Sequence, residues 1–263
     1  MNGGRSFDFK LDRAEHHLRE TAGLIAEYNA SEPYKVDKRA PAAAGGRPTF
    51  WLEFTAQPAP RIAMALGDFV HNLRSALDHL ACALVPAEQR ETMSFPVFFH
   101  GVWEPADDRD SQRRKDQRKR WQWCTRHMDP RAIDVLRRVQ PPDNEGTDEE
   151  MDYGLRVVQY LDNRDKHRAL PIVASGLVNT TGEMRGPDGR WRPARGALNQ
   201  GETVTAGPIV VPQGVVDLRL QGTPLVMVDT GRRSGRLLIP GPFPTFLHEV
   251  RELAAWLRPL LAP

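Results

Sequence analysis

Residues 67–80 read Gly67-Asp68-Phe69-Val70-His71-Asn72-Leu73-Arg74-Ser75-Ala76-Leu77-Asp78-His79-Leu80. They form the centre of a helical pattern that extends from about Arg61 to Val85. At about 100° per residue, one sector of this helix is apolar and predicts the core face. That sector comprises Val70, Leu73, Leu77, Leu80, Ala81 and Leu84. The remaining sector holds Arg74, Asp78, His71, Ser75, Asp68, His79 and Asn72.

The polar sector differs from an ordinary solvent face. It contains one arginine and neither lysine nor glutamate, whereas the last helical pattern carries Arg251, Glu252 and Arg258. Short hydrogen-bonding groups, imidazoles and aspartates are typical of side chains positioned against one another or against a ligand. The same pattern also fits a face that is buried against the rest of the chain and hydrogen-bonded internally. The sequence leaves these two interpretations open.

Periodicity on either side of this helix predicts the other elements. Amphipathic spacing predicts helices over Leu11–Tyr28, Pro130–Val139 and Met151–Leu161, and a final helix from Phe246 to Leu261. Partial alternation predicts a hairpin of Tyr34–Arg39 and Phe50–Phe54. After Ala169 the pattern changes to short strands over Leu170–Val178, Val215–Leu220 and Pro224–Val228, with turns at 182–189 and 231–235. An acidic loop at 143–150 precedes Met151.

These elements predict an α+β fold. We expect a bundle of four or five helices over residues 1–169, with the small hairpin near 34–56. An antiparallel β subdomain follows at 170–241, and a C-terminal helix at 242–263 returns to the bundle.

Composition bounds the class of protein. With 263 residues, 40% apolar and 27% charged, the chain can bury a substantial core and is not expected to be disordered. The apolar runs Leu80–Val85 and Pro208–Pro212 are too short for a bilayer, so we expect a cytoplasmic protein with no membrane partner. Cys82 and Cys124 are too few for a disulfide framework or a four-cysteine zinc site. The net charge of +2 makes no global case for nucleic acid.

The quoted stretch, with Asp165-Lys166-His167-Arg168 further along, resembles a group of uncharacterised bacterial proteins. The Arg74-x4-His79 spacing also resembles the catalytic motif of HEPN ribonucleases, a helical superfamily common in toxin–antitoxin and phage-defence systems. This resemblance implies that His79 is the general base for an RNA 2′-hydroxyl and that Arg74 stabilises charge on the phosphate. It further implies a HEPN-like bundle, no metal or cofactor, and a site shared across a homodimer. Ser75 departs from the family, which usually has Asn, Asp or His after the arginine.

A second group of residues lies at the end of the helix predicted over Met151–Leu161. Asp165, Lys166 and His167 there are expected either to form a basic helix end or to bring His167 to His71, Asp78 or His79. His71, Asp78, His79 and His167 are suitable metal ligands, but their spacing matches no ligand signature, and no metal is predicted.

The segment 109–126 is strongly basic. Eight basic residues and two aspartates give it a net charge of +6, and two tryptophans lie within it. Basic charge beside exposed aromatic rings suits single-stranded RNA. The expected RNA-binding residues are Arg113, Arg114, Lys115, Arg118, Lys119, Arg120, Trp121 and Trp123. A solvated charged segment anchored by buried tryptophans is the alternative. His16, His17, His100, His127 and His248 have no partner at an informative spacing and are expected to be structural or exposed.

Two functions are therefore expected from the sequence. The first is a metal-independent endoribonuclease, a toxin or defence effector, with Arg74 and His79 as its catalytic pair. The second is a non-catalytic ligand-binding or protein-interaction module on a helical bundle, in which the same polar face docks the β unit, a small ligand or a partner chain. A metal-binding bundle with histidine and aspartate ligands is a further form of this alternative.

Overall fold

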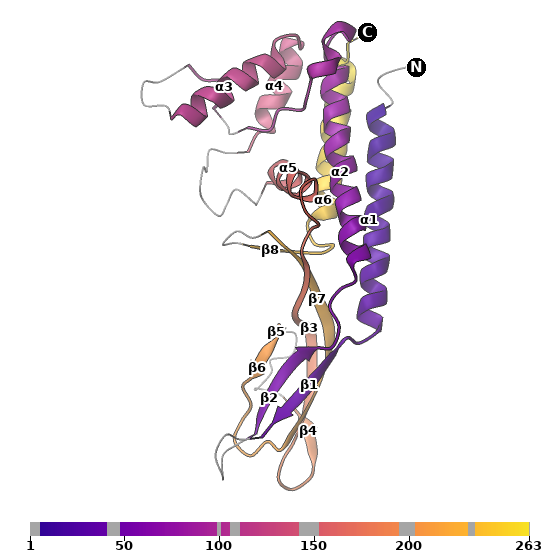
Figure 1. Ribbon diagram of the computed structural model, residues 1–263, viewed down its shortest axis with the longest axis vertical. Helices are drawn as coiled ribbons and strands as arrows, with labels where there is room; N and C mark the ends of the chain where they lie inside the picture. The colour runs from indigo at the N-terminus through magenta and orange to yellow at the C-terminus, as the bar shows by residue number, and fades with distance from the viewer. Residues whose placement is uncertain are drawn as a thin grey trace.

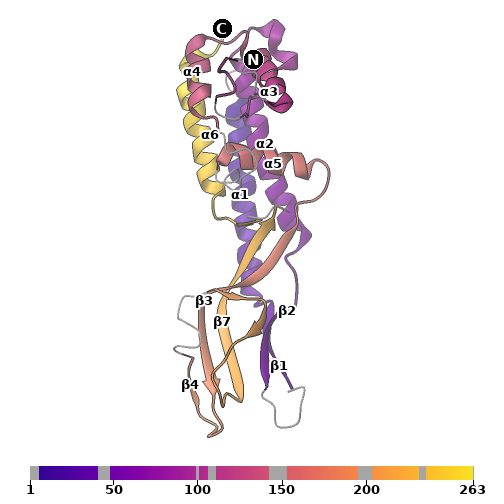
Figure 2. The ribbon, with the colours of Figure 1, turned by 90° about the vertical axis from the view of Figure 1, so that its left-hand side faces the viewer.

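The computed structural model describes residues 6–40, 48–98, 101–105, 111–141, 153–194, 203–230 and 235–262. The molecule is elongated, with the helices gathered at one end and the strands at the other (Figures 1 and 2). The acidic loop, Met151, His100, Arg109 and the turn at 231–234 lie outside the described residues.

Two long helices form the axis of the helical end. α1 (Ser6–Ala30) runs down to the β end, and α2 (Pro60–Ala83) returns beside it, with α6 (Phe243–Leu257) alongside (Figure 1). Three shorter helices lie on one side of this group, α3 (Gln112–Thr125) and α4 (Pro130–Arg138) at the end far from the strands and α5 (Gly154–Asp165) nearer the strands, against α2 (Figure 1). Short 3-10 turns at Ala87–Thr92 and Arg258–Leu260 follow α2 and α6. The helical end is therefore organised around α2.

The core face predicted for α2 is confirmed. Leu73 and Leu77 have no exposed surface and Leu80 only 1%, and all three belong to a core cluster shared with α1, α5 and α6. Phe69 of α2 meets Phe243 of α6 edge-to-face, with ring centroids 5.8 Å apart. Burying this stripe is the main term that stabilises a helix pair, because isolated helices are only marginally stable in water.

The β end contains two antiparallel sheets. The first has the order β1 (Tyr34–Arg39), β2 (Thr49–Phe54), β6 (Gly207–Ile209). The second has the order β4 (Trp191–Pro193), β3 (Ile172–Arg185), β7 (Asp217–Asp229), β8 (Arg236–Leu238), and β5 (Val204–Thr205) also pairs with β3. A separate apolar cluster lies between the sheets and includes Phe50, Leu52, Leu177, Leu218 and Leu220.

Several expectations are met and others are corrected. The α+β class and antiparallel pairing are confirmed. The described residues form six α-helices where four or five were expected, and the added one is the basic segment, α3. The hairpin does not stand apart, because β2 pairs with β6 from the 170–241 region. The two strands expected over Val215–Val228 are one strand, β7, which pairs with β3 across two register shifts. In the described ranges, no helix has the length and apolar character that a bilayer crossing requires.

Candidate functional site

Arg74 lies inside the protein. The residue is 9% exposed, and its Nη2 donates to Asp78 Oδ1 at 2.7 Å and to the Phe95 carbonyl at 2.9 Å. The Phe95 amide donates to the same Asp78 oxygen at 2.8 Å. Arg74 and Asp78 thus bind both backbone groups of Phe95 and hold the chain after α2 against that helix. Arg74 was expected to stabilise charge on a phosphate, and in the structure both hydrogen bonds of its Nη2 go to groups of the protein.

His79 is not connected to this network. It is half-buried, and within the described residues no hydrogen bond or ion pair of its ring is found. It lies about 140° around the helix from Arg74, so the two side chains point in different directions. Ser75, one turn before His79, is also half-buried. The structure therefore leaves the proposed Arg74–His79 pair without a shared partner.

A second cluster forms where α5 meets α2. Asp162 is 2% exposed, and its two carboxylate oxygens bind different side chains. His71 Nδ1 lies 3.1 Å from Oδ1, and Lys166 Nζ lies 2.6 Å from Oδ2. The side chains of His71 and Lys166 are 54% and 51% exposed, so the cluster joins a buried carboxylate to two groups at the surface. Asp162 is the centre of the site.

The packing of α5 places Asp162 there. Leu155, Val158 and Leu161 bury one side of α5 in the core. In the last turn of α5, Arg164 Nη1 donates to the Thr230 carbonyl at 2.6 Å and links the helix to the end of β7. α5 continues to Asp165, so Asp165 belongs to its last turn and Lys166 follows as its C-cap, whereas the sequence predicted a helix ending at Leu161.

Gly67 of α2 makes room for Asp165. A Cβ atom at Gly67 would lie 2.7 Å from both carboxylate oxygens of Asp165, which is closer than real contacts allow. Burial raises the pKa of Asp165, and the neighbouring carboxylates of Asp68 and Asp162 raise it further, while His71 acts in the opposite direction. Asp165, which lies near the His71–Asp162 pair, therefore holds a proton more tightly than an ordinary aspartate does.

The remaining residues expected at this site fall in different places. His167 is exposed and does not join His71, Asp78 or His79 in any hydrogen bond among the described residues. The Asn72 side chain donates to the Asp68 carbonyl within α2 at 2.8 Å. In the described part of the chain, the ligand atoms of His71, Asp78, His79 and His167 are not gathered as a metal would require.

The basic segment divides into buried and exposed residues. Trp121 is 2% exposed and packs against Phe98 and Trp103. Arg118 is 8% exposed, and its Nε donates to the Glu104 carbonyl at 2.8 Å. These two residues anchor α3, which corrects their expected role in RNA binding. Trp123 is 37% exposed, with the Arg126 guanidinium 4.7 Å from its ring centre. The exposed cations of α3 are Arg113, Lys119 and Arg120, and Arg114 and Lys115 are half-buried.

Comparison with known proteins adds no relative. No protein-family model, no curated protein and no solved structure matches this chain. Function is therefore inferred from the chemistry of the site itself.

The sequence also indicates that Asp162 is buried, but the predicted helix ended at Leu161 and therefore did not include it. Leu155, Val158, Asp162 and Asp165 follow one another at three- and four-residue spacing, so both aspartates lie on the buried face of α5. A carboxylate at a core position of an amphipathic helix requires a partner on the facing element. Here the partner is His71, which lies on the polar face predicted for α2.

Proposed function

We propose that this chain is a metal-independent ribonuclease whose general base is His71 in place of His79. The observation that carries the proposal is the contact of His71 Nδ1 with the buried Asp162 carboxylate, in an imidazole that remains more than half exposed. An ionised carboxylate only accepts hydrogen bonds, so Nδ1 carries the proton and Nε2 presents a lone pair. A carboxylate-oriented imidazole with a free Nε2 is the arrangement of a general base.

Lys166 and Asp165 supply the complementary groups. The Lys166 ammonium is half exposed at the same carboxylate and can stabilise negative charge on a phosphate. Asp165, whose pKa is raised, can donate a proton. In the proposed reaction His71 removes the 2′-hydroxyl proton, the 2′-oxygen bonds to phosphorus, and the bond from phosphorus to the 5′-oxygen breaks. Asp165 protonates the departing oxygen, and the products are a 2′,3′-cyclic phosphate and a free 5′-hydroxyl.

The basic residues of α3 support RNA as the substrate. α3 and α5 lie on the same side of the α1–α2 pair (Figures 1 and 2). Arg113, Lys119 and Arg120 of α3 are exposed, and the Trp123 ring of the same helix is 37% exposed. Cations that bind phosphates and a ring on which a base can stack are the two elements of single-strand binding.

One observation favours the non-catalytic alternative. Both Asp162 oxygens are bound by protein groups, so the His71–Asp162–Lys166 cluster also fastens α2 to α5. A cluster with only this role would make the chain a binding or interaction module, and it would leave RNA intact.

The experiment is RNA cleavage in EDTA by the full chain. We expect products with 2′,3′-cyclic phosphate ends, and a loss of about 10²-fold or more in the His71→Ala variant. His127→Ala is the matched control, because His127 is exposed at the end of α3, away from the cluster, and its loss should leave cleavage unchanged. Absence of cleavage by the parent chain, or equal rates for His71→Ala and the parent, would contradict the proposal.

A further inference from the structure

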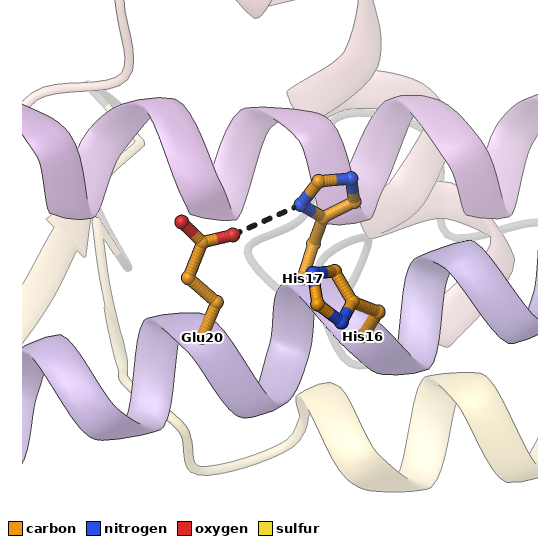
Figure 3. Close-up of side chains that lie close together, drawn as sticks. All are labelled: His16, His17 and Glu20. Carbon is orange, nitrogen blue, oxygen red and sulfur yellow. Dashed lines mark hydrogen bonds and ion pairs between the residues drawn. The ribbon is translucent and has the colours of Figure 1, made fainter.

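His16, His17 and Glu20 of α1 form a separate group of metal-binding side chains (Figure 3). One ligand atom from each residue can be chosen so that all three lie within 4.8 Å of one another. Within the described residues, no other group of three histidine, cysteine, aspartate or glutamate side chains satisfies that condition. The group uses none of the residues in the α2–α5 cluster.

The side chains are already directed toward one another. Figure 3 shows the Glu20 carboxylate pointing at the His17 ring, with the His16 ring beside it. His17 Nδ1 lies 3.2 Å from Glu20 Oε2, and the two imidazole centroids are 5.3 Å apart. His17 is 9% exposed, while His16 and Glu20 are exposed, so the site is anchored on one side and open to solvent on the other.

The separation of His17 and Glu20 suits tetrahedral coordination. Metal–nitrogen and metal–oxygen bonds of about 2.0–2.1 Å at a tetrahedral angle place two ligand atoms roughly 3.3 Å apart. The observed separation of 3.2 Å is close to this value. A metal ion can therefore replace the proton between these two atoms without moving the helix, and a rotation of the exposed His16 ring supplies the third ligand.

The charge of Glu20 supports a cation at this position. Among the described residues, Glu20 forms an ion pair only with His17, and no lysine or arginine lies on its carboxylate. Neighbouring carboxylates of α1 are neutralised differently, since Glu15 binds both Arg19 and Arg251. The carboxylate of Glu20 is thus left to the two imidazoles.

We propose that His16, His17 and Glu20 bind one Zn²⁺ ion, with water completing the coordination. Two imidazoles and a carboxylate are a common zinc ligand set. Zn²⁺ has no geometric preference from its d electrons, so it accepts three ligands arranged by a single helix. The α1 backbone is held in place at this point, because the buried Thr21 hydroxyl donates to the His17 carbonyl at 2.8 Å.

The test is a calorimetric titration of the metal-free full chain with Zn²⁺. We expect one ion per chain, and at least about tenfold weaker binding in both His16→Ala and Glu20→Gln, because removing even an outer partner of a metal ligand weakens affinity by about 10–100-fold. Both positions are exposed, so the variants should retain the parent's thermal unfolding in EDTA. His127→Ala, which removes a different exposed histidine, should bind zinc as the parent does.

A second measurement identifies the ligands. Co²⁺ bound in place of Zn²⁺ should give the visible absorption of a tetrahedral site in the parent, and that absorption should be lost in His16→Ala. Zinc binding that is unchanged in His16→Ala and Glu20→Gln would overturn the proposal. So would a titration in which the parent binds no stoichiometric zinc, or one in which His127→Ala weakens binding as much as His16→Ala does.

Discussion

Replacing Arg74 by methionine tests whether this residue is structural. Methionine keeps most of the side-chain volume, so the main loss is the two hydrogen bonds donated by Nη2. The buried carbonyl of Phe95 then has no donor from α2, which costs about 1–3 kcal/mol. The charge-assisted bond to Asp78 contributes about 1.5–3 kcal/mol, which the variant also loses. Since both bonds come from one guanidinium nitrogen, the two terms do not add fully, and we expect a total of about 2–4 kcal/mol.

The assay is urea unfolding followed by tryptophan fluorescence. Arg61→Met is the matched control, because Arg61 lies on the same helix in an ion pair with Glu27 whose two side chains are 60% and 63% exposed. Exposed pairs contribute about 0–1 kcal/mol, so this variant should remain near the parent. Hydrogen exchange at the Phe95 amide should also accelerate in Arg74→Met, since Asp78 loses the partner that orients it. Equal free energies of unfolding for Arg74→Met and Arg61→Met would refute the structural role of Arg74.

Three further outcomes follow from the site and from α3. Because the pKa of Asp165 is raised above its ordinary value of 3.8, its carboxyl contributes stability below that pH and loses it as the pH rises through the raised value. Asp165→Asn should therefore melt at a higher temperature than the parent at neutral pH, with the difference vanishing below about pH 4; a lower melting temperature at neutral pH would contradict this. Gly67→Ala should leave the free energy of unfolding nearly unchanged, because a gain of about 1 kcal/mol in helix propensity offsets the displacement of Asp165. It should nevertheless reduce RNA cleavage, and full activity would show that Asp165 does not need the space beside Gly67. The double variant Lys119→Glu, Arg120→Glu should reduce the slope of log RNA affinity against log salt concentration by about 0.7 for each phosphate that these two side chains neutralise, without changing urea unfolding. Arg118→Glu, in contrast, should lower the stability of the chain to urea. An unchanged slope in the double variant would show that α3 does not bind RNA.

Hydrophobic periodicity accounts for what could be predicted of the fold. In α2 the apolar positions repeat without interruption, and Leu73, Leu77 and Leu80 are all buried. In α3 the apolar positions do not repeat. Arg118 is buried because it donates to the carbonyls of residues 104 and 105, and Trp121 because it packs against Phe98 and Trp103, and no local pattern reveals either contact. The pairing of β2 with β6 is likewise set by interactions between strands that lie far apart in the sequence.

The site was predictable only in part. Composition alone marked the polar face of α2 as unusual, and residues 165–167 were expected either to form a basic helix end or to bring His167 to that face. Which histidine of α2 contacts a carboxylate depends on the position along α2 at which α5 packs. That position is set by the buried apolar face of α5 and by the hydrogen bond from Arg164 to the Thr230 carbonyl. For Arg74, the spacing to His79 in the sequence suggested a catalytic role, whereas in the structure its side chain is hydrogen-bonded to the Phe95 carbonyl.

Chemical rescue of His71→Ala asks whether the His71 imidazole itself is the general base. If it is, removing it should abolish RNA cleavage in EDTA, and free imidazole should restore cleavage in proportion to the concentration of its neutral form. The variant should keep its fold, because the His71 side chain is more than half exposed and Lys166 still pairs with the buried Asp162 carboxylate. Cleavage by His71→Ala at the parent's rate would contradict this role. The role would also be contradicted if imidazole failed to restore cleavage in His71→Ala and instead restored the cleavage that is lost in His79→Ala.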